Sequence, residues 1–323
     1  MEMKKIALEE AIVVPGRDLI LEHKSHPEFS QNLVRLKDIH KLRIDSMDEA
    51  GIDLSVLSVT TPGLQSLALA SQLESCAQKW NDYLIDCVTQ SPNRFRAFAC
   101  IPTYAPELAI NELERLKGVQ EIVGCLINGY DSSGYTSAKY LDDNAYDEFW
   151  GYINDNNIPV YIHPRGIPEG RVATYSPYQA LHGSTWGFHI ETAEHVLRLM
   201  LSGLFDRYQN LKIIIGHMGE MLAFWAWRLD HRLEEEGWLE KLQCNKTITE
   251  YLNSNIFLTT SGFFDTPSLM HAIATVSVDR IMFSVDYPYE DNLKASQWLD
   301  SLQLDDEDKK KISYLNAAKL LNI

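Results

Sequence analysis

The stretch Pro-Val-Tyr-Ile-His-Pro at residues 159–164 shows the pattern from which the fold is predicted. It is a short apolar run, typical of a buried strand, and a histidine stands near its end. Seven further apolar, β-branched runs occur along the 323 residues, each bounded by turn or polar residues. Runs that are apolar on both faces predict the strands of a parallel sheet covered by helices. The eight predicted strands cover residues 5–10, 54–60, 95–102, 122–128, 159–164, 211–216, 256–261 and 280–286.

Segments with helical spacing of apolar residues lie between most of these strands. Such alternation in one chain of this length favours a (β/α)8 TIM-type barrel, which takes about 250 residues. An open doubly wound sheet is the main alternative, but no G-x-G-x-x-G or G-x-x-x-x-G-K-[ST] motif follows any strand. We expect one domain over residues 1–323, with a long loop at 13–38, an insertion at 165–186 and a terminal helix at 305–321. The clearest helices are predicted at 66–90, 107–116, 145–156, 190–208, 220–236 and 267–277.

Composition narrows the possible partners. With 45 acidic and 29 basic side chains, the formal net charge of −16 opposes binding to nucleic acid or to anionic membranes. No stretch is long and apolar enough for a membrane span or for the core of a signal peptide. The five cysteines include no C-x-x-C pair, so we expect buried thiols and a cytoplasmic protein.

Polar residues at the predicted strand ends form the candidate site, because the C-terminal ends of barrel strands carry the functional groups. Four of the eight ends carry carboxylates or imidazoles and a fifth carries an amide; the residues are Glu9, Glu10, Asn128, His163, His217 and Asp286. Oxygen and imidazole ligands in this pattern predict a hard or borderline divalent cation. Side chains alternate along a strand, so Glu9 and Glu10 face opposite ways, and alternation alone does not choose between them.

Each of these residues also has a plain structural interpretation. His163 alone could equally be a core histidine bonded to backbone. His217 lies on a glycine-flanked turn, three residues before Glu220 at the start of a predicted helix, so these side chains can face the same way. The spacing is not H-E-x-x-H and no G-x-S-x-G is present, so neither hydrolase motif is found. Two other histidines, His189 and His195, lie on or near an apolar predicted helix, where we expect a hydrogen-bonded packing role.

Seven motifs occur in a fixed order: Ala-Leu-Glu-Glu-Ala (7–11), Ile-His-Pro-Arg (162–165), Ser-Gly-Leu-Phe-Asp (202–206), Ile-Gly-His-Met-Gly-Glu (215–220), Trp-Arg-Leu-Asp-His-Arg (227–232), Thr-Thr-Ser-Gly (259–262) and Phe-Ser-Val-Asp-Tyr-Pro-Tyr-Glu (283–290). Together they resemble the aromatic acid decarboxylases of the amidohydrolase superfamily, which include gamma-resorcylate, 2,3-dihydroxybenzoate and 5-carboxyvanillate decarboxylases. The resemblance runs from end to end and is weaker at 13–38 and 166–181. Many superfamily members begin with His-x-His, where this chain has Glu9 and Ala11. This departure argues against a two-metal hydrolytic site.

The resemblance implies one divalent metal ion, manganese, zinc or magnesium, bound by Glu9, His163 and Asp286. His217 would lie in or beside the coordination shell, and Glu220 would pair with it.

The resemblance also implies contacts to an aromatic carboxylic acid substrate. Arg228 matches the family's substrate-contacting arginine, which would act across a subunit boundary in a homodimer or homotetramer. Arg43 and Asn128 are weaker matches.

The implied activity is non-oxidative decarboxylation of an ortho-hydroxybenzoate. Direct loss of carbon dioxide would leave an aryl carbanion, so the ring carbon must be protonated first. Asp286 is the candidate proton donor, assisted by His217 and Glu220. Two alternatives stay open. One is a metal-dependent hydrolase or hydratase of the same superfamily acting on a lactone or a non-aromatic dicarboxylic acid, and the other is a catalytically silent barrel that serves as a binding protein.

Overall fold

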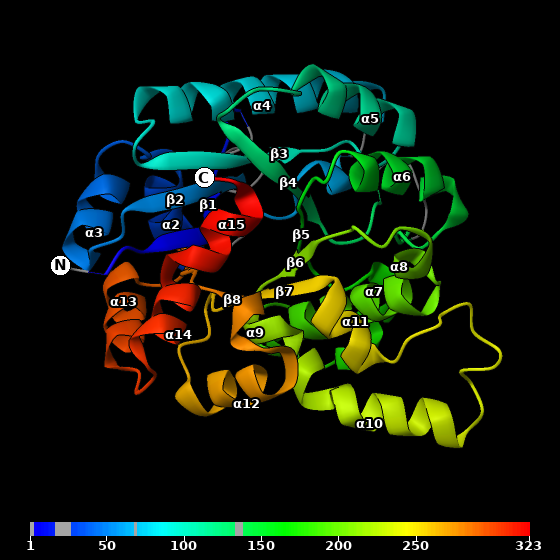
Figure 1. Ribbon diagram of the computed structural model, residues 1–323. Coiled ribbons are helices and arrows are strands. Elements are labelled where there is room, and N and C mark those ends of the chain that lie inside the picture. The colour runs from blue at the N-terminus through cyan, green and yellow to red at the C-terminus, as the bar shows by residue number, and fades with distance from the viewer. Residues whose placement is uncertain (1–2, 17–26, 68–69, 133–137) are drawn as a thin grey trace.

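Eight parallel strands follow one another in chain order to form the barrel (Figure 1). The computed structural model describes residues 3–16, 27–67, 70–132 and 138–323. Every ladder between consecutive strands is parallel, as buried apolar runs separated by helices predict. The strands are β1 (Ile6–Ile12), β2 (Leu54–Val59), β3 (Phe95–Cys100), β4 (Ile122–Asn128), β5 (Val160–His163), β6 (Ile213–Ile215), β7 (Ile256–Thr259) and β8 (Ile281–Met282).

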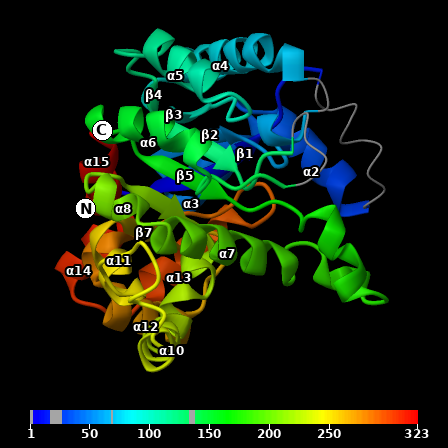
Figure 2. The same cartoon turned by 90° about the vertical axis from the view of Figure 1, so that its right-hand side faces the viewer.

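Helices connect the strands and cover the outside of the barrel (Figures 1 and 2). Each of the predicted helices is present with shifted ends, and the one predicted at 190–208 is divided into α7 and α8. The predicted (β/α)8 barrel is therefore confirmed. The helices are α3 (Leu42–Ala50), α4 (Leu73–Gln90), α5 (Pro106–Arg115), α6 (Asp147–Asp155), α7 (Gly187–Leu201), α8 (Leu204–Arg207), α9 (His217–Glu220), α10 (Leu222–Glu235), α11 (Ile248–Ser254), α12 (Thr266–Val276), α13 (Asn292–Ser301), α14 (Asp306–Lys310) and α15 (Asn316–Leu321).

Apolar side chains fill the barrel near the beginnings of the strands. Ala317 and Leu321 of α15 pack against this inner cluster. Because apolar side chains occupy this half of the interior, the polar residues are left at the opposite mouth, where the strands end. The inner cluster contains Ile6, Leu8, Leu54, Val56, Phe98, Leu126, Tyr161, Ile214 and Met282.

The long loop predicted at residues 13–38 is wrong in part, because helix α2 (Pro27–Lys37) forms within it. Leu33 and Leu36 are buried against the end of β1. Tertiary burial of this apolar pair stabilises the helix, and the sequence of the segment alone does not reveal it. Residues 17–26 of the predicted loop lie outside the described residues.

The other predicted segments differ in detail. The insertion at 165–186 contains two short 3-10 helices, Glu169–Tyr175 and Gln179–Leu181. The terminal helix predicted at 305–321 contains a π turn, Lys311–Leu315, between α14 and α15. Within the described part of the chain, we find no helix whose length and apolarity suit a membrane crossing.

Candidate metal centre and active site

Four side chains from the strand ends meet at the C-terminal mouth of the barrel. The Oε1 atom of Glu9 lies 3.1 Å from Nε2 of His163 and 3.7 Å from Nε2 of His217. The same His217 nitrogen is 3.7 Å from Oδ2 of Asp286. Ligand atoms of Glu9, His217 and Asp286 all lie within 4.8 Å of one another, and His163 adjoins this group through Glu9. The structure thus brings together the four candidate metal ligands.

Glu9 is directed into this cluster at an irregularity of β1. The register of β1 against β2 shifts between Ala7 and Glu10, so β1 carries an extra residue there. Such bulges redirect side chains beside functional sites. The Oε2 atom of Glu9 accepts hydrogen bonds from the hydroxyls of Tyr161 and Ser261. Its Oε1 atom is buried and has no hydrogen-bond partner among the described residues.

Each histidine is held through the ring nitrogen that faces away from Glu9. Nδ1 of His163 lies 2.7 Å from the carbonyl oxygen of Pro164, which only accepts, so we assign the ring proton to Nδ1. Nδ1 of His217 lies 2.7 Å from Oε1 of Glu220, and the same assignment follows. In the neutral form of each ring, which metal binding requires, Nε2 presents a lone pair toward Glu9. Without a cation, burial acts to lower the pKa of His217, but the charges of Glu220 and Glu9 outweigh it and raise the pKa.

Lone pairs that converge with no proton between them form a site for a cation. The donor set, carboxylate oxygen and imidazole nitrogen, suits manganese, zinc or magnesium. A ligating histidine commonly donates its other ring N–H to a carboxylate or a carbonyl, as both rings do here. The unpartnered Oε1 atom of Glu9 is an atom that such an ion would satisfy. The residues therefore fit one divalent metal ion.

The two carboxylates of the cluster differ in their electrostatic surroundings. Burial raises the pKa of Asp286 to about 6, and the charge of Glu9 contributes to this shift. Burial also acts to raise the pKa of Glu9, but the charge of His217 and the contacts with His163 outweigh it and lower the pKa to about 2. Without a cation, Glu9 is therefore the more acidic of the two carboxyl groups.

His217 and Glu220 belong to a left-handed turn rather than to the start of an ordinary helix. The five residues from His217 to Met221 have φ values of 49°, 58°, 85°, 50° and 64°. Gly219 adopts this region freely, whereas each other residue costs about 1 kcal/mol. The predicted right-handed helix start is wrong, because α10 begins only at Leu222. The strained turn nevertheless brings the two side chains face to face.

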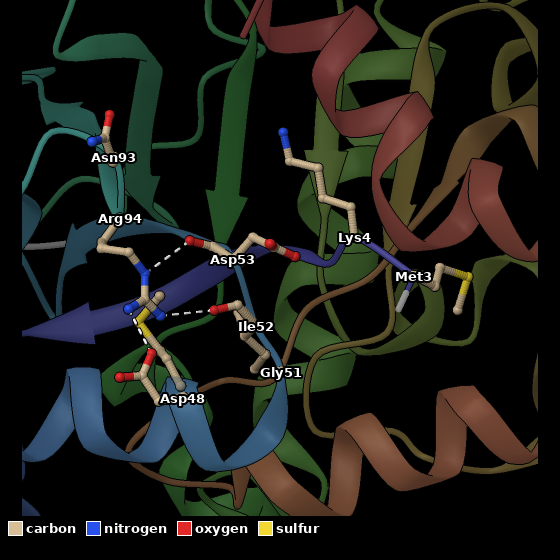
Figure 3. A pocket seen from close by; sticks show the side chains of 9 residues that line it. Met3, Lys4, Asp48, Gly51, Ile52, Asp53, Asn93 and Arg94 are labelled. Carbon is tan, nitrogen blue, oxygen red and sulfur yellow. Dashed lines mark hydrogen bonds and ion pairs between the residues drawn. The ribbon is translucent and has the colours of Figure 1, made fainter. Parts of the chain in front are cut away.

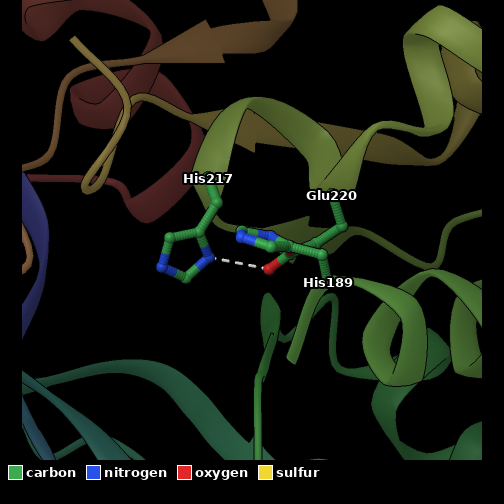
Figure 4. Close-up of side chains that lie close together, drawn as sticks. All are labelled: His189, His217 and Glu220. Atoms are coloured by element: carbon green, nitrogen blue, oxygen red, sulfur yellow. Dashed lines mark hydrogen bonds and ion pairs between the residues drawn. The ribbon is translucent and has the colours of Figure 1, made fainter. Parts of the chain in front are cut away.

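Glu220 also binds a third ring, that of His189 on α7. Oε2 of Glu220 lies 2.5 Å from Nδ1 of His189, while Oε1 holds His217 (Figure 4). His189 was predicted only to pack, because 31 residues separate it from Glu220 and no sequence pattern links the two. His195 does pack, since its Nε2 accepts from the backbone N–H of Leu141. Both Nδ1 atoms that meet at Glu220 are already hydrogen-bonded, so this trio supports the metal centre.

Asp286 lies beyond the short strand β8, with a φ of 78°. The loop that carries it is held by Glu10, whose carboxylate accepts from the backbone N–H groups of Val285 and Tyr287 at 3.1 and 3.2 Å. Glu9 therefore faces the histidines and Glu10 faces the loop, which decides the choice that strand alternation leaves open.

The three predicted substrate-binding residues have different surroundings. Asn128 pairs with His163 across β4 and β5, and its buried Oδ1 has no partner among the described residues. Arg43 is buried and donates to the carbonyl oxygen of Ala11 at 2.5 Å. Arg228 is exposed on α10.

A separate cavity of about 520 Å³ lies at the opposite end of the barrel, where the strands begin (Figure 3). Its lining includes Lys4, Asp53 and Arg94, which precede β1, β2 and β3. The Arg94 guanidinium donates to Asp48 and to the carbonyl oxygens of Ile52 and Asp53. These donors are thus used within the protein, and this end of a barrel serves stability rather than catalysis.

Comparison with known proteins gives consistent similarities. The profile of the amidohydrolase family matches residues 35–323. A gamma-resorcylate decarboxylase of Polaromonas sp. (strain JS666) is 39% identical over 327 residues, covering 99% of this chain and 98% of that protein. A crystal structure of a 2,6-dihydroxybenzoate decarboxylase complexed with 2,6-dihydroxybenzoate has a TM-score of 0.94 at 35% identity, covering 100% of both chains. A dihydroxybenzoic acid decarboxylase from Polaromonas sp. JS666, solved with manganese and the inhibitor 2-nitroresorcinol, has a TM-score of 0.94 at 38% identity, covering 99% of this chain and 97% of the other.

Proposed function

The chain belongs to the amidohydrolase family, and from that premise we propose that it is a divalent-metal-dependent decarboxylase of an ortho-hydroxybenzoate. The observation that carries the proposal is the convergence of ligand atoms from Glu9, His163, His217 and Asp286 at the barrel mouth. Relatives named gamma-resorcylate decarboxylase support the reaction class. The ligand of a similar structure makes 2,6-dihydroxybenzoate the first substrate to test.

We assign the metal ligands to Glu9, His163 and Asp286, with His217 bound to the ion or directly beside it. Manganese is the first ion to test, because a similar decarboxylase was solved with it. Zinc and magnesium accept overlapping donor types. When bound, the ion supplies Lewis acidity that stabilises ionised oxygens of an acidic substrate.

The proton that the reaction consumes is assigned to Asp286. It is added to the ring carbon that bears the carboxylate; the bond to the carboxyl carbon then breaks, its electron pair restores the aromatic ring, and carbon dioxide leaves. Asp286 is a carboxyl group that lies beside His217 at the barrel mouth, where the substrate would bind. His217, held by Glu220, lies beside it to orient the substrate hydroxyl.

We propose that a second copy of the chain completes the substrate site. Helix α10 exposes Phe224, Trp225 and Trp227 by 72%, 50% and 71% of their surface. An exposed aromatic face of this kind suits a contact between proteins. Arg228 is exposed on the same helix, so it can reach the substrate of a partner in a homodimer or homotetramer. Its charge would then bind the substrate carboxylate.

Further parts of the proposal rest on single observations. Arg43 and Asn128 are proposed as weaker substrate contacts, since Nε and Nη1 of the arginine and Oδ1 of the asparagine have no partner among the described residues. A cytoplasmic location is proposed because the five cysteines are free thiols. We also propose that residues 1–323 form one domain.

Carbon dioxide release from a panel of benzoates tests the proposed function. The manganese-loaded protein should decarboxylate 2,6-dihydroxybenzoate and other ortho-hydroxybenzoates, but neither benzoate nor 4-hydroxybenzoate, which lack the ortho oxygen. Chelation should abolish the activity and added Mn²⁺ should restore it. If the metal-loaded protein releases no carbon dioxide from any ortho-hydroxybenzoate, the proposal is wrong, and hydrolysis of a lactone would favour the hydrolase alternative.

A further inference from the structure

The barrel is closed differently between β8 and β1 than between its other strands. Parallel ladders join β1 to β8 in succession, but among the described residues no ladder joins β8 back to β1. One backbone hydrogen bond, from the N–H of Ala11 to the carbonyl oxygen of Tyr287 at 2.8 Å, crosses this seam beyond the strand end. The metal-ligand candidates Glu9 and Asp286 lie on its two sides, so whatever closes the seam also sets their separation.

At this seam, the side chains of Ser284 and Glu10 make hydrogen bonds that connect the two strands. The Oγ atom of Ser284 accepts from the backbone N–H groups of Leu8 and Glu9 at 3.1 and 2.7 Å, and its hydroxyl donates to Oε1 of Glu10 at 3.2 Å. Oε1 of Glu10 also accepts from the N–H of Val285, and its Oε2 accepts from the N–H of Tyr287. Glu10 is 1% exposed, so no solvent replaces these bonds.

The two amides that Glu10 binds belong to the residues on either side of Asp286. Asp286 itself has a φ of 78°, in the left-handed region that residues other than glycine rarely adopt. A carboxyl group whose two oxygens bind the preceding and the following amide at once fixes this peptide segment. The guanidinium of Arg43 lies 4.6 Å from the centre of the Tyr287 ring and also contacts this loop.

We infer that Glu10 is a positioning residue of the metal centre, which holds the Asp286 loop so that the Asp286 carboxylate meets Glu9 and His217. Glu10 touches neither ion nor substrate in this role. The inference rests on the proposed function and deepens it, since it assigns the second glutamate of the Glu9-Glu10 pair to the geometry of the ligand set. The inference predicts a lower metal affinity when Glu10 is changed, and this affinity can be measured without substrate.

The test compares the Mn²⁺ affinity of Glu10→Gln with that of the unsubstituted protein, by calorimetry and by electron paramagnetic resonance of the bound ion. Glutamine keeps the shape but has a single acceptor oxygen, so one of the two flanking amides meets an NH₂ group. We expect a folded protein whose Mn²⁺ affinity falls by about ten- to a hundredfold, the range found when supporting hydrogen bonds of metal ligands are removed. The resonance spectrum should also broaden because the ligands are less well fixed.

The matched control is Glu112→Gln. Glu112 is also buried, at 3% exposed, and also accepts hydrogen bonds, from Asn81 and Arg115, but it lies on α5 away from the mouth. The Glu112→Gln variant should have a lower free energy of unfolding and an unchanged Mn²⁺ affinity. Ser284→Ala removes only the hydroxyl of the seam and serves as the milder variant should Glu10→Gln not fold; its affinity should fall in the same direction.

Unchanged Mn²⁺ affinity and an unchanged resonance spectrum in folded Glu10→Gln, or in Ser284→Ala where that variant alone folds, would overturn the inference. So would an equal loss of affinity in Glu112→Gln, because the effect would then be one of general stability. An unsubstituted chain that binds Mn²⁺ but releases no carbon dioxide would contradict the proposed reaction alone, since the affinity comparison needs no substrate.

Discussion

The Oε1 atom of Glu9 and the Nε2 atom of His163 lie 3.1 Å apart, and in the neutral ring, whose proton is on Nδ1 toward Pro164, neither atom has a proton for the other. Two acceptors at this distance in a buried site repel unless a cation lies between them. The hydroxyls of Tyr161 and Ser261 occupy the other oxygen of Glu9, so Oε1 is left for the ion.

Glu9→Gln should therefore lose the metal. The amide NH₂ can donate to Nε2 of His163 and would stabilise the metal-free arrangement. We expect a folded protein with little bound Mn²⁺, measured by elemental analysis, and a decarboxylation rate lower by about a thousandfold, equivalent to about 4 kcal/mol. Glu49→Gln, an exposed change on α3, is the control and should keep both properties. Full metal content in Glu9→Gln would contradict the assignment of Glu9.

Asp286→Asn should abolish turnover while the barrel stays folded. The amide cannot deliver a proton to the ring carbon, whatever metal the site retains. Circular dichroism should be unchanged, and product formation should fall below detection in a carbon dioxide assay. Near-normal turnover with metal bound would exclude Asp286 as the proton donor.

Gly219→Ala should disturb the left-handed turn that carries His217 and Glu220. The φ of Gly219 is 85°, and a Cβ atom there would lie 2.8 Å from Cδ2 of Leu258. We expect a loss of unfolding free energy of about 2 kcal/mol, of which about 1 kcal/mol is backbone strain, together with reduced activity. Gly118→Ala is a matched control, since Gly118 has a φ of 82° and nothing within 4 Å of the new Cβ.

The Gly118→Ala control should lose only the backbone-strain part of the unfolding free energy, about 1 kcal/mol, and should keep full activity. Equal losses of stability in chemical denaturation, with equal activities, would show that the turn does not fix the His217 side chain.

Glu191→Gln should change how stability depends on pH. Burial raises the pKa of Glu191 to about 8, and both carboxyl oxygens lack hydrogen-bond partners among the described residues. Between pH 4.5 and about 8 the folded protein keeps a proton that the unfolded chain releases, so this group makes the native state less stable as pH rises. Glutamine mimics the protonated acid and removes that loss.

Urea unfolding from pH 5.5 to 8.5 measures the effect. The stability of Glu191→Gln relative to the unsubstituted protein should rise with pH, by at most about 1.4 kcal/mol per unit. Parallel curves for Glu191→Gln would mean that the native carboxyl is already ionised.

Arg228 can be tested by mixing two inactive variants. If it acts in a partner's site, Arg228→Ala and Asp286→Asn chains should each be inactive alone. After unfolding and refolding together they should recover up to about a quarter of normal activity, because half of the dimers are mixed and each has one intact site. No recovery, despite mixed dimers detected by native mass spectrometry, would place Arg228 outside the partner's site.

The strands and the residues at their ends could be predicted from the sequence because both depend on local patterns. An apolar run must be buried, and parallel order brings every run's last residue to the same mouth. His163, His217 and Asp286 follow directly from this rule. The metal-ligand roles of these residues came from the resemblance, not from spacing.

The supporting contacts could not be predicted because they depend on tertiary structure. The left-handed conformation from His217 to Met221 opposes the intrinsic preference of four residues and exists only because packing imposes it. His189 reaches Glu220 from a different helix. Glu10 and Glu9 are equivalent by alternation, and only the bulge in β1 and the position of the Asp286 loop distinguish them.

Anomalous diffraction at the manganese edge, from crystals grown with Mn²⁺, tests the central claim most directly. We predict one strong peak within bonding distance of Glu9, His163 and Asp286, with His217 in contact or directly beside it. A peak held instead by His189 and Glu220, or no peak at the mouth of a protein that decarboxylates with Mn²⁺, would contradict the assignment of the metal centre.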